Sequence, residues 1–172
     1  MIATPRTRLR WWRETDREAF AALNAHPEVV LDPGGPLGRV ASDAELDRYA
    51  ATFDRHGFCR WALERRDGTF LGCVGRMPAG PDHPFGAHFE VGWRLVRHAW
   101  GRGYATEAAR AAPEDVFTRL GLREVLAYTA PEHPRSRAVP VRPGLRRNPS
   151  LDVAADYDGI ETWRGLVWHA RA

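Results

Sequence analysis

Hydrophobic and polar residues alternate along several segments of the chain, and such alternation predicts β-strands. The pattern is found at residues 6–12, 87–96, 123–130 and 161–170. Two further apolar segments, FCRWALERR and TFLGCVGRMP, lie on either side of the dipeptide Asp67-Gly68. That dipeptide is typical of a tight turn, so the two segments are predicted to form a β-hairpin.

Helical spacing of apolar residues predicts helices at residues 14–25 and 104–120. Ser42-Asp43-Ala44-Glu45 resembles a capping box and predicts another helix from residue 42 to about residue 56. The Pro- and Gly-rich residues 26–41 are predicted to form a loop. The element order β-α-α-β-β-β-α-β-(α)-β-β predicts an α/β (α+β) fold with a mixed, mainly antiparallel sheet of about 6–7 strands. A length of 172 residues is consistent with a single domain over residues 1–172.

Three prolines interrupt the helical pattern of the second half. Pro113 is expected to kink or break the helix near Ala112, because proline lacks a backbone N–H and its ring clashes with the preceding turn. Pro140 should end a helix that begins at Pro134, and Pro143 should prevent it from resuming. We therefore expect a short helix at residues 134–139.

Composition limits the classes of protein to be considered. Hydrophobic residues make up 44% of the chain and charged residues 27%, values that are ordinary for a globular protein. No apolar run approaches the ~18 residues of a membrane span, and the N-terminus lacks the apolar core of a signal peptide, so we expect a cytoplasmic protein. All 25 basic residues are arginine, which indicates a GC-rich and bacterial genome. The net charge of +3 comes without a clustered basic tract, so we expect no nucleic-acid partner, although RNA or ribosome binding remains an alternative.

Several common sites are absent from the sequence. The chain has no lysine and hence no phosphate-binding Gly-x-x-x-x-Gly-Lys motif, and its glycine turn lies too late for a dinucleotide-binding first turn. The seven histidines are scattered, so we expect no metal site. The hairpin would place Cys73 opposite Ala62 and on the other face from Cys59, so we expect no disulfide between the two cysteines.

The segment RHAWGRGYATEAAR, residues 97–110, predicts an anion-binding site. It places Gly101 and Gly103 between a strand and a helix that begins at about Tyr104. The first N–H groups of a helix have no internal partner, and glycine lets a phosphate approach the backbone closely. Arg97 and Arg102 would add positive charge. The alternative is an ordinary strand-to-helix turn in which the glycines serve only the backbone conformation.

The sequence W-G-R-G-Y-A-T-E-A, following E-V-G-W-R-L, resembles motif A of the GNAT superfamily of N-acetyltransferases. It is most similar to the RimJ/RimL-like branch, which acetylates ribosomal-protein N-termini. The superfamily pattern is Gln/Arg-x-x-Gly-x-Gly/Ala, and His98 departs from its first position. The resemblance covers most of the chain and implies the GNAT fold, with helices on both faces of the sheet.

The resemblance also implies acetyl-coenzyme A as the co-substrate, with no metal. Its diphosphate would bind the N–H groups between about Ala99 and Ala105, and its pantetheine arm would lie along Leu95-Val96-Arg97. A backbone N–H near Val96 would stabilise the oxyanion of the reacting carbonyl. The residues expected to bind the cofactor are Leu95, Val96, Arg97, His98, Trp100, Gly101, Arg102, Gly103, Tyr104, Ala105, Thr106, His133 and Ser136.

For catalysis, the resemblance implies that Glu90 accepts a proton from the amine and that Ser136 protonates the departing thiolate. The alternatives are a solvated strand glutamate and a helix-surface hydroxyl. His133 replaces the family's asparagine. Asp32, Trp93 and Glu90 are expected to line the acceptor site, and His26 is a further candidate. A cationic amine would favour acidic residues there, and Glu28, Asp32 and Glu90 are available. The acceptor would be a primary amine, on a protein N-terminus or a small molecule, and the protein a monomer or homodimer. A non-catalytic acyl-coenzyme A-binding module of the same fold is the alternative.

Overall fold

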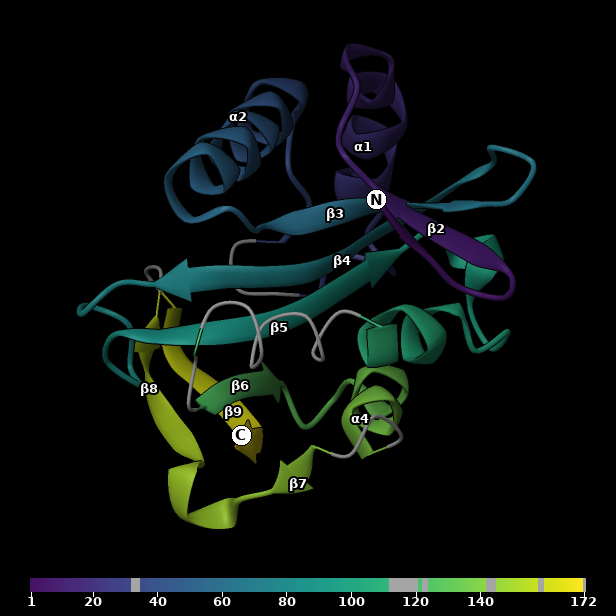
Figure 1. The fold of residues 1–172 in the computed structure, drawn as a ribbon. Helices are drawn as coiled ribbons and strands as arrows, with labels where there is room; N and C mark the ends of the chain where they lie inside the picture. The colour runs from purple at the N-terminus through teal and green to yellow at the C-terminus, as the bar shows by residue number, and fades with distance from the viewer. Residues whose placement is uncertain (32–34, 112–120, 122–123, 142–144, 158–159, 172) are drawn as a thin grey trace.

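A computed structural model describes residues 1–31, 35–111, 121, 124–141, 145–157 and 160–171 (Figure 1). The helices are η1 (Glu14–Asp16), α1 (Arg17–Asn24), α2 (Arg39–His56), η2 (Arg97–Ala99), a helix that includes residues 104–111, α4 (Pro134–Val141) and η3 (Pro149–Leu151). The strands are β1 (Ile2–Ala3), β2 (Thr7–Arg10), β3 (Arg60–Arg65), β4 (Phe70–Ala79), β5 (His88–Leu95), β6 (Glu124–Thr129), β7 (Arg146–Arg147), β8 (Val153–Tyr157) and β9 (Ile160–Arg171).

The strands form one mixed sheet in the order β1-β2-β3-β4-β5-β6-β9-β7, with β8 paired to β9. Every pairing is antiparallel except that of β5 with β6. The predicted mixed and mainly antiparallel sheet is therefore confirmed. The described residues form nine strands rather than the predicted 6–7, because β1 and β7 have two residues each and are too short to show a hydrophobic period.

Helices cover both faces of the sheet, as expected. On one face, α1 and α2 pack over a buried cluster that includes Phe20, Tyr49 and Cys73. On the other face, the helix at residues 104–111 contributes Ala108 and Ala109 to a cluster with Leu71. The spacing of small residues along that helix lets it lie close to the sheet. No helix among the described residues combines the length and the apolar character needed to cross a bilayer.

The helix predicted from Ser42 begins earlier than the capping pattern indicates. Its first residue is Arg39, and Gly38 occupies the N-cap without a side-chain hydrogen bond. Ser42 is fully buried inside α2, where its hydroxyl accepts a hydrogen bond from Nδ2 of Asn24 at 3.0 Å. The serine therefore satisfies a buried amide on α1 rather than capping α2, and a buried amide needs such a partner.

The β3–β4 hairpin forms as predicted, but its cysteines lie differently. Cys73 does pair with Ala62. Cys59, however, precedes β3 and packs in the same buried cluster as Cys73, so the prediction of opposite faces is wrong. The strand alternation on which it relied does not extend to residue 59, which lies before the first residue of β3. Both thiols are free.

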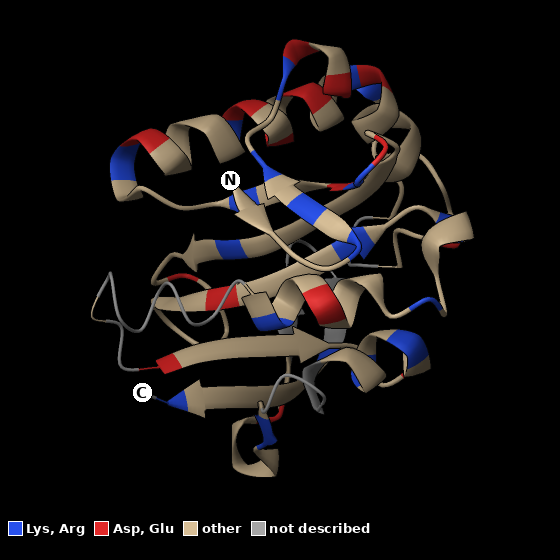
Figure 2. Cartoon of the chain, turned by 45° about the vertical axis from the view of Figure 1, so that its right-hand side comes forward, with Lys and Arg blue, Asp and Glu red and all other residues tan. Residues whose placement is uncertain are grey.

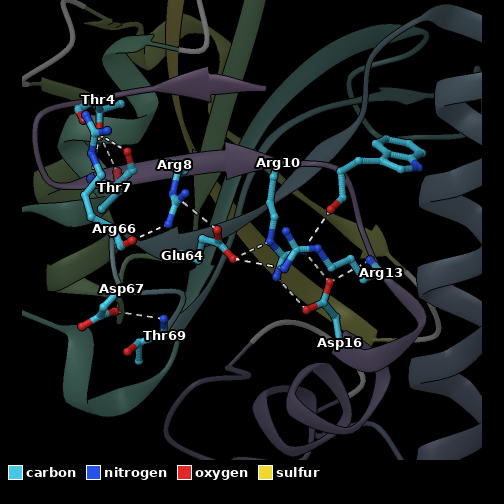
Figure 3. A network of polar contacts seen from close by, with 11 residues as sticks. Thr4, Thr7, Arg8, Arg10, Arg13, Asp16, Glu64, Arg66, Asp67 and Thr69 are labelled. Atoms are coloured by element: carbon cyan, nitrogen blue, oxygen red, sulfur yellow. Dashed lines mark hydrogen bonds and ion pairs between the residues drawn. The ribbon is translucent and has the colours of Figure 1, made fainter.

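A buried ion-pair network joins β2 to its neighbours (Figure 3). Arg10 of β2 donates both terminal nitrogens to Asp16, at 2.7 and 2.8 Å, and its Nε donates to Glu64 of β3 at 2.5 Å. Burial would raise the pKa of Asp16, but the hydrogen bonds from Arg10 and from the Arg13 backbone lower it overall. Asp16 is therefore ionised at neutral pH, and a bidentate arginine holds it in place.

The short helix predicted at residues 134–139 is α4, which spans Pro134–Val141 and so extends two residues beyond the prediction. Pro134 is its first residue, where a missing N–H costs nothing. Pro140 lies in the last turn, where it removes one hydrogen bond without stopping the helix at once. The kink predicted near Pro113, and Pro143, lie outside the described residues.

Candidate functional site

The glycine turn connects β5 to the helix that includes residues 104–111. After η2, Gly101 has a φ of 72° and Gly103 a φ of 79°. This left-handed region is costly for residues with a side chain, so the turn requires glycine at both positions. A Cβ built on Gly101 would meet no heavy atom within 4 Å. The turn is therefore open, and no side chain of the described residues fills the space in front of Gly101.

The start of the following helix presents unpaired donors to this space. The N–H of Glu107 donates to the carbonyl of Gly103 at 3.0 Å. The N–H groups of residues 104–106 precede this bond and have no partner within the helix. Gly101, Gly103 and residues 104–106 all line a cavity of about 400 Å³. Backbone donors at a helix N-terminus are suited to a phosphate group, so this cavity can bind an anion without lysine.

The same cavity extends along the strand that leads into the turn. β4 and β5 pair over eight residues, from Gly72↔Leu95 to Ala79↔His88. β5 and β6 pair only at Glu90↔Leu126, so the two parallel strands do not continue as a ladder toward the turn. The cavity is lined there by the end of β5 and by α4, and Figure 1 shows α4 near that end of the sheet. A long ligand can therefore enter between β5 and α4.

Nine of the predicted cofactor-binding residues line this cavity: Leu95, Trp100, Gly101, Gly103, Tyr104, Ala105, Thr106, His133 and Ser136. The other four, Val96, Arg97, His98 and Arg102, do not. Residues of α4 and of the segment before it also line the cavity, and sequence reasoning missed Glu132, Pro134, Arg135, Ala138 and Val139. The sequence did predict a short helix from Pro134, and its residues could have been recognised from that helix as possible walls of the cavity. Further walls come from Glu28, Val29 and Leu31, which follow α1, and from Trp93, Arg94 and Ala99.

Two groups at the end of β5 already have partners. The N–H of Val96 itself donates to the carbonyl of Leu71 at 3.0 Å, so an oxyanion donor near Val96 would have to be a different N–H. Arg97 donates from Nε to Glu28 at 2.7 Å, and its guanidinium lies 4.9 Å from the Trp100 ring centroid. Its charge is thus partly neutralised before any anion arrives. Asp32 lies outside the described residues.

A second, larger cavity of about 890 Å³ adjoins the first. The two share the side chains of Leu31, Trp93, Arg94, His133 and Ser136 as walls. Nε1 of Trp93 on β5 donates to Oγ of Ser136 on α4 at 3.1 Å. This hydrogen bond occupies an acceptor site of the hydroxyl and leaves its proton available to another group. The hydroxyl of Ser136 thus lies at the boundary of the two cavities, where a reaction between their ligands would occur.

Glu90 of β5 lines the second cavity and forms an ion pair with Arg60 of β3. The side chains of Glu90 and Arg60 are only 16% and 15% exposed. Burial would raise the pKa of Glu90, but the charge of Arg60 and a hydrogen bond from Tyr128 lower it overall. Glu90 is therefore a carboxylate at neutral pH, fixed in direction by an arginine. Sequence reasoning missed Arg60, one of 25 arginines.

Gly92 makes room for this arginine. A Cβ at Gly92 would lie 2.5 Å from Nη2 and 2.8 Å from Cζ of Arg60, well inside normal contact distances. The guanidinium therefore lies directly over the backbone of β5, two residues beyond Glu90. Nη1 of Arg60 also reaches the hydroxyl of Tyr49 on α2 at 3.4 Å. The glycine of the E-V-G-W segment thus serves the ion pair rather than a turn.

Neither cysteine offers a nucleophile to this site. Burial raises the pKa of Cys73 to about 11, and it raises the pKa of Cys59 further. Thiols with such values stay protonated at neutral pH and do not attack a thioester.

Within the described ranges, no group of three or more His, Cys, Asp and Glu side chains could hold a metal ion. Figure 2 shows acidic and basic residues interspersed along the chain rather than separated into one basic face.

The chain matches the family described as "Acetyltransferase (GNAT) domain" over residues 6–146. It is similar to a Bacillus subtilis (strain 168) protein named as an uncharacterized N-acetyltransferase, YoaA, with 24% identity over 152 residues that cover 86% of this chain and 83% of the relative. A crystal structure of an acetyltransferase from Agrobacterium tumefaciens str. C58 superposes with a TM-score of 0.82 at 27% identity, covering 99% of this chain and 94% of the other. Mycobacterium smegmatis RimJ in complex with CoA-disulfide superposes with a TM-score of 0.73 at 23% identity, covering 96% and 82%. The chain therefore belongs to the GNAT acetyltransferase family, and its open glycine turn, the helix N-terminus after it and the two adjoining cavities are consistent with this membership.

Proposed function

We propose that the protein transfers the acetyl group of acetyl-coenzyme A to a primary amine, by direct attack while both substrates are bound. The observation that carries this proposal is the meeting of two cavities at Trp93 and Ser136. One cavity ends at a set of backbone anion donors, and the other contains a fixed carboxylate. The RimJ neighbour from Mycobacterium smegmatis was solved with a coenzyme A disulfide, which supports the same ligand here.

The first cavity fits the coenzyme in its chemistry and its shape. Its diphosphate would bind the N–H groups of the glycine turn and of residues 104–106, where Gly101 leaves the backbone exposed. Its pantetheine arm would pass Leu95 and lie between β5 and α4. Bound in this way, the coenzyme supplies a thioester at the boundary of the two cavities. The departures at His133 and at the prolines of α4 leave these backbone donors unchanged.

In the second cavity, Glu90 and Ser136 would handle the two protons of the reaction. The ion pair with Arg60 keeps Glu90 deprotonated, the form that can accept a proton from the attacking amine, directly or through water. Its lowered pKa makes this transfer less favourable, so Glu90 also serves to orient the cationic amine. The hydroxyl proton of Ser136, left available by Trp93, would be donated to the departing sulfur.

The experiment that tests this function has two stages. Acetyl-coenzyme A is titrated into the purified protein by calorimetry, and amines are then screened by the release of free thiol. We expect binding in the micromolar range, and for an accepted amine a fall in kcat of at least a hundredfold in Glu90→Gln with unchanged coenzyme affinity. No binding at millimolar coenzyme would contradict the proposal. Binding without turnover of any amine would support a non-catalytic acyl-coenzyme A-binding module.

More specifically, we propose that the acceptor amine is the N-terminus of a protein, as in the RimJ/RimL-like branch. It is supported by the motif and by the structural likeness to RimJ. The amine screen therefore includes short peptides with a free N-terminus alongside small-molecule amines. A preference for peptides would support this branch, and a preference for small amines would place the protein elsewhere in the family.

A further inference from the structure

The N-terminal segment of the chain contacts the glycine turn directly. Arg6 lies just before β2, and its Nη1 donates to the carbonyl oxygen of Arg102 at 2.8 Å. Its Nε donates to Oε2 of Glu107 at 2.7 Å, and its backbone N–H donates to Oε1 at 2.9 Å. The hydroxyl of Thr4 donates to the same Oε1 at 2.5 Å. One arginine therefore joins the start of the chain to both the turn and the helix that follows it.

The contact with Arg102 orients the next peptide group. In a trans peptide, the carbonyl and the N–H point in opposite directions, and the described chain has no cis peptide. Because the carbonyl of Arg102 points to Arg6, the N–H of Gly103 points away from Arg6. Gly103 lines the cavity of about 400 Å³, whereas neither Arg6 nor Arg102 does. The bond from Arg6 thus fixes the direction of the Gly103 N–H, on the side of the turn away from Arg6.

A turn with two glycines needs such an external contact. Glycine has access to more backbone conformations than any other residue, so the direction of this N–H is not determined locally. Glu107 is 15% exposed, and its carboxylate is surrounded by the donors of Arg6 and Thr4. Burial would raise the pKa of Glu107, but these hydrogen bonds lower it overall. The carboxylate is thus a stable anchor for Arg6, whose guanidinium also lies 4.9 Å from the ring centroid of Tyr104.

We propose that Arg6 is a positioning residue of the coenzyme site, which holds the N–H of Gly103 in the orientation that binds the diphosphate. The inference rests on the proposed function, because it takes coenzyme A as the ligand of the cavity. Arg6 acts through the turn and does not line the cavity itself. Its removal should therefore weaken the diphosphate contact while leaving the pantetheine contact unchanged.

The test compares Arg6→Met with Arg8→Met. Arg8 lies on β2 two residues further on, where it donates to the carbonyl of Arg66 and forms an ion pair with Glu64 at 3.5 Å (Figure 3). Neither of these partners belongs to the glycine turn. Each variant is titrated with coenzyme A and with pantetheine, which lacks the diphosphate. We expect about tenfold weaker coenzyme A binding in Arg6→Met, which is about 1.4 kcal/mol. We expect unchanged pantetheine binding in both variants and unchanged coenzyme A binding in Arg8→Met.

Coenzyme A binding of Arg6→Met at the wild-type level would overturn the proposal, as would an equal loss for both ligands. If Arg6→Met does not fold, Arg6→Lys takes its place, since one ammonium cannot reproduce the planar fork that reaches both partners. The amide resonance of Gly103 in the ligand-free protein gives a second readout. It should shift in the Arg6 variants and not in Arg8→Met, and an unshifted resonance would also overturn the proposal. Failure of the wild type to bind coenzyme A would contradict the proposed function instead, and the Gly103 resonance would still decide whether Arg6 holds the turn.

Discussion

Replacing Gly101 with valine should have two separate effects. It should lower the stability of the folded protein slightly, through the backbone conformation of the turn, and it should weaken coenzyme binding strongly. Gly101 has a φ of 72°, and a Cβ there would meet no heavy atom within 4 Å. The Cβ of valine therefore meets no neighbour in the folded protein, and the main cost to stability is its left-handed backbone, about 1–3 kcal/mol. For a chain of this length, that is a fall in Tm of about 2–4 °C for each kcal/mol.

The effect on coenzyme binding should be much larger. The new side chain would stand at the open wall of the cavity, in front of the backbone donors that we propose bind the diphosphate. Hydrogen bonds to a charged group contribute about 1.5–3 kcal/mol each, so the loss of two raises Kd by at least about a hundredfold. Calorimetric titration with coenzyme A measures Kd, and a thermal melt of the same sample measures Tm.

Gly68→Val is the matched control. Gly68 has a φ of 89°, a Cβ there would also meet nothing within 4 Å, and the residue lies in the turn between β3 and β4, outside both cavities. The two variants should lose similar stability, and only Gly101→Val should lose coenzyme affinity. A Gly101→Val protein that binds coenzyme A within threefold of the wild type would refute the placement of the diphosphate at this turn.

Three further predictions concern buried charges. Replacing Arg10 with methionine leaves Asp16 without its arginine and should lower the free energy of unfolding by about 3–5 kcal/mol in urea titrations. Because the pKa of Asp16 is lowered in the folded state, its contribution is complete above its ordinary value of 3.8 and is lost as pH falls through the folded pKa. Asp16→Asn should therefore flatten the acid limb of the stability profile, and an unchanged limb would contradict this assignment. Gly92→Ala should displace the guanidinium of Arg60, raise the pKa of Glu90 and move the acid limb of kcat/KM to higher pH, whereas an unshifted limb would show that Arg60 does not control Glu90.

The elements around the glycine turn could be predicted because they depend on residues close in sequence. The alternation at residues 87–96 corresponds to β5, and the alanine spacing after Tyr104 corresponds to a helix whose described part is residues 104–111. Gly101 and Gly103 both take the left-handed backbone that only glycine adopts readily. The local pattern was misleading at Ser42, where a distant partner intervened, because the serine hydroxyl accepts a hydrogen bond from Asn24 of another helix.

Side-chain partners could not be predicted from the same information. Arg60 and Glu90 are 30 residues apart in sequence, and Arg6 and Glu107 are 101 apart. With 25 arginines and 22 acidic residues, the composition allows many such pairs, and none has a local signature. The availability of the Val96 N–H was decided in the same way, because its partner Leu71 comes from the neighbouring strand.

By itself, then, the sequence determined the order and kind of most elements and the position of the open glycine turn, because hydrophobic period, glycine and helix start act over a few residues. The tertiary structure alone decided which charges are neutralised, which backbone donors remain free and where the two cavities meet. These properties depend on strand register and on the packing of helices against the sheet, which bring together groups from opposite ends of the chain. Local spacing carries no information about those contacts.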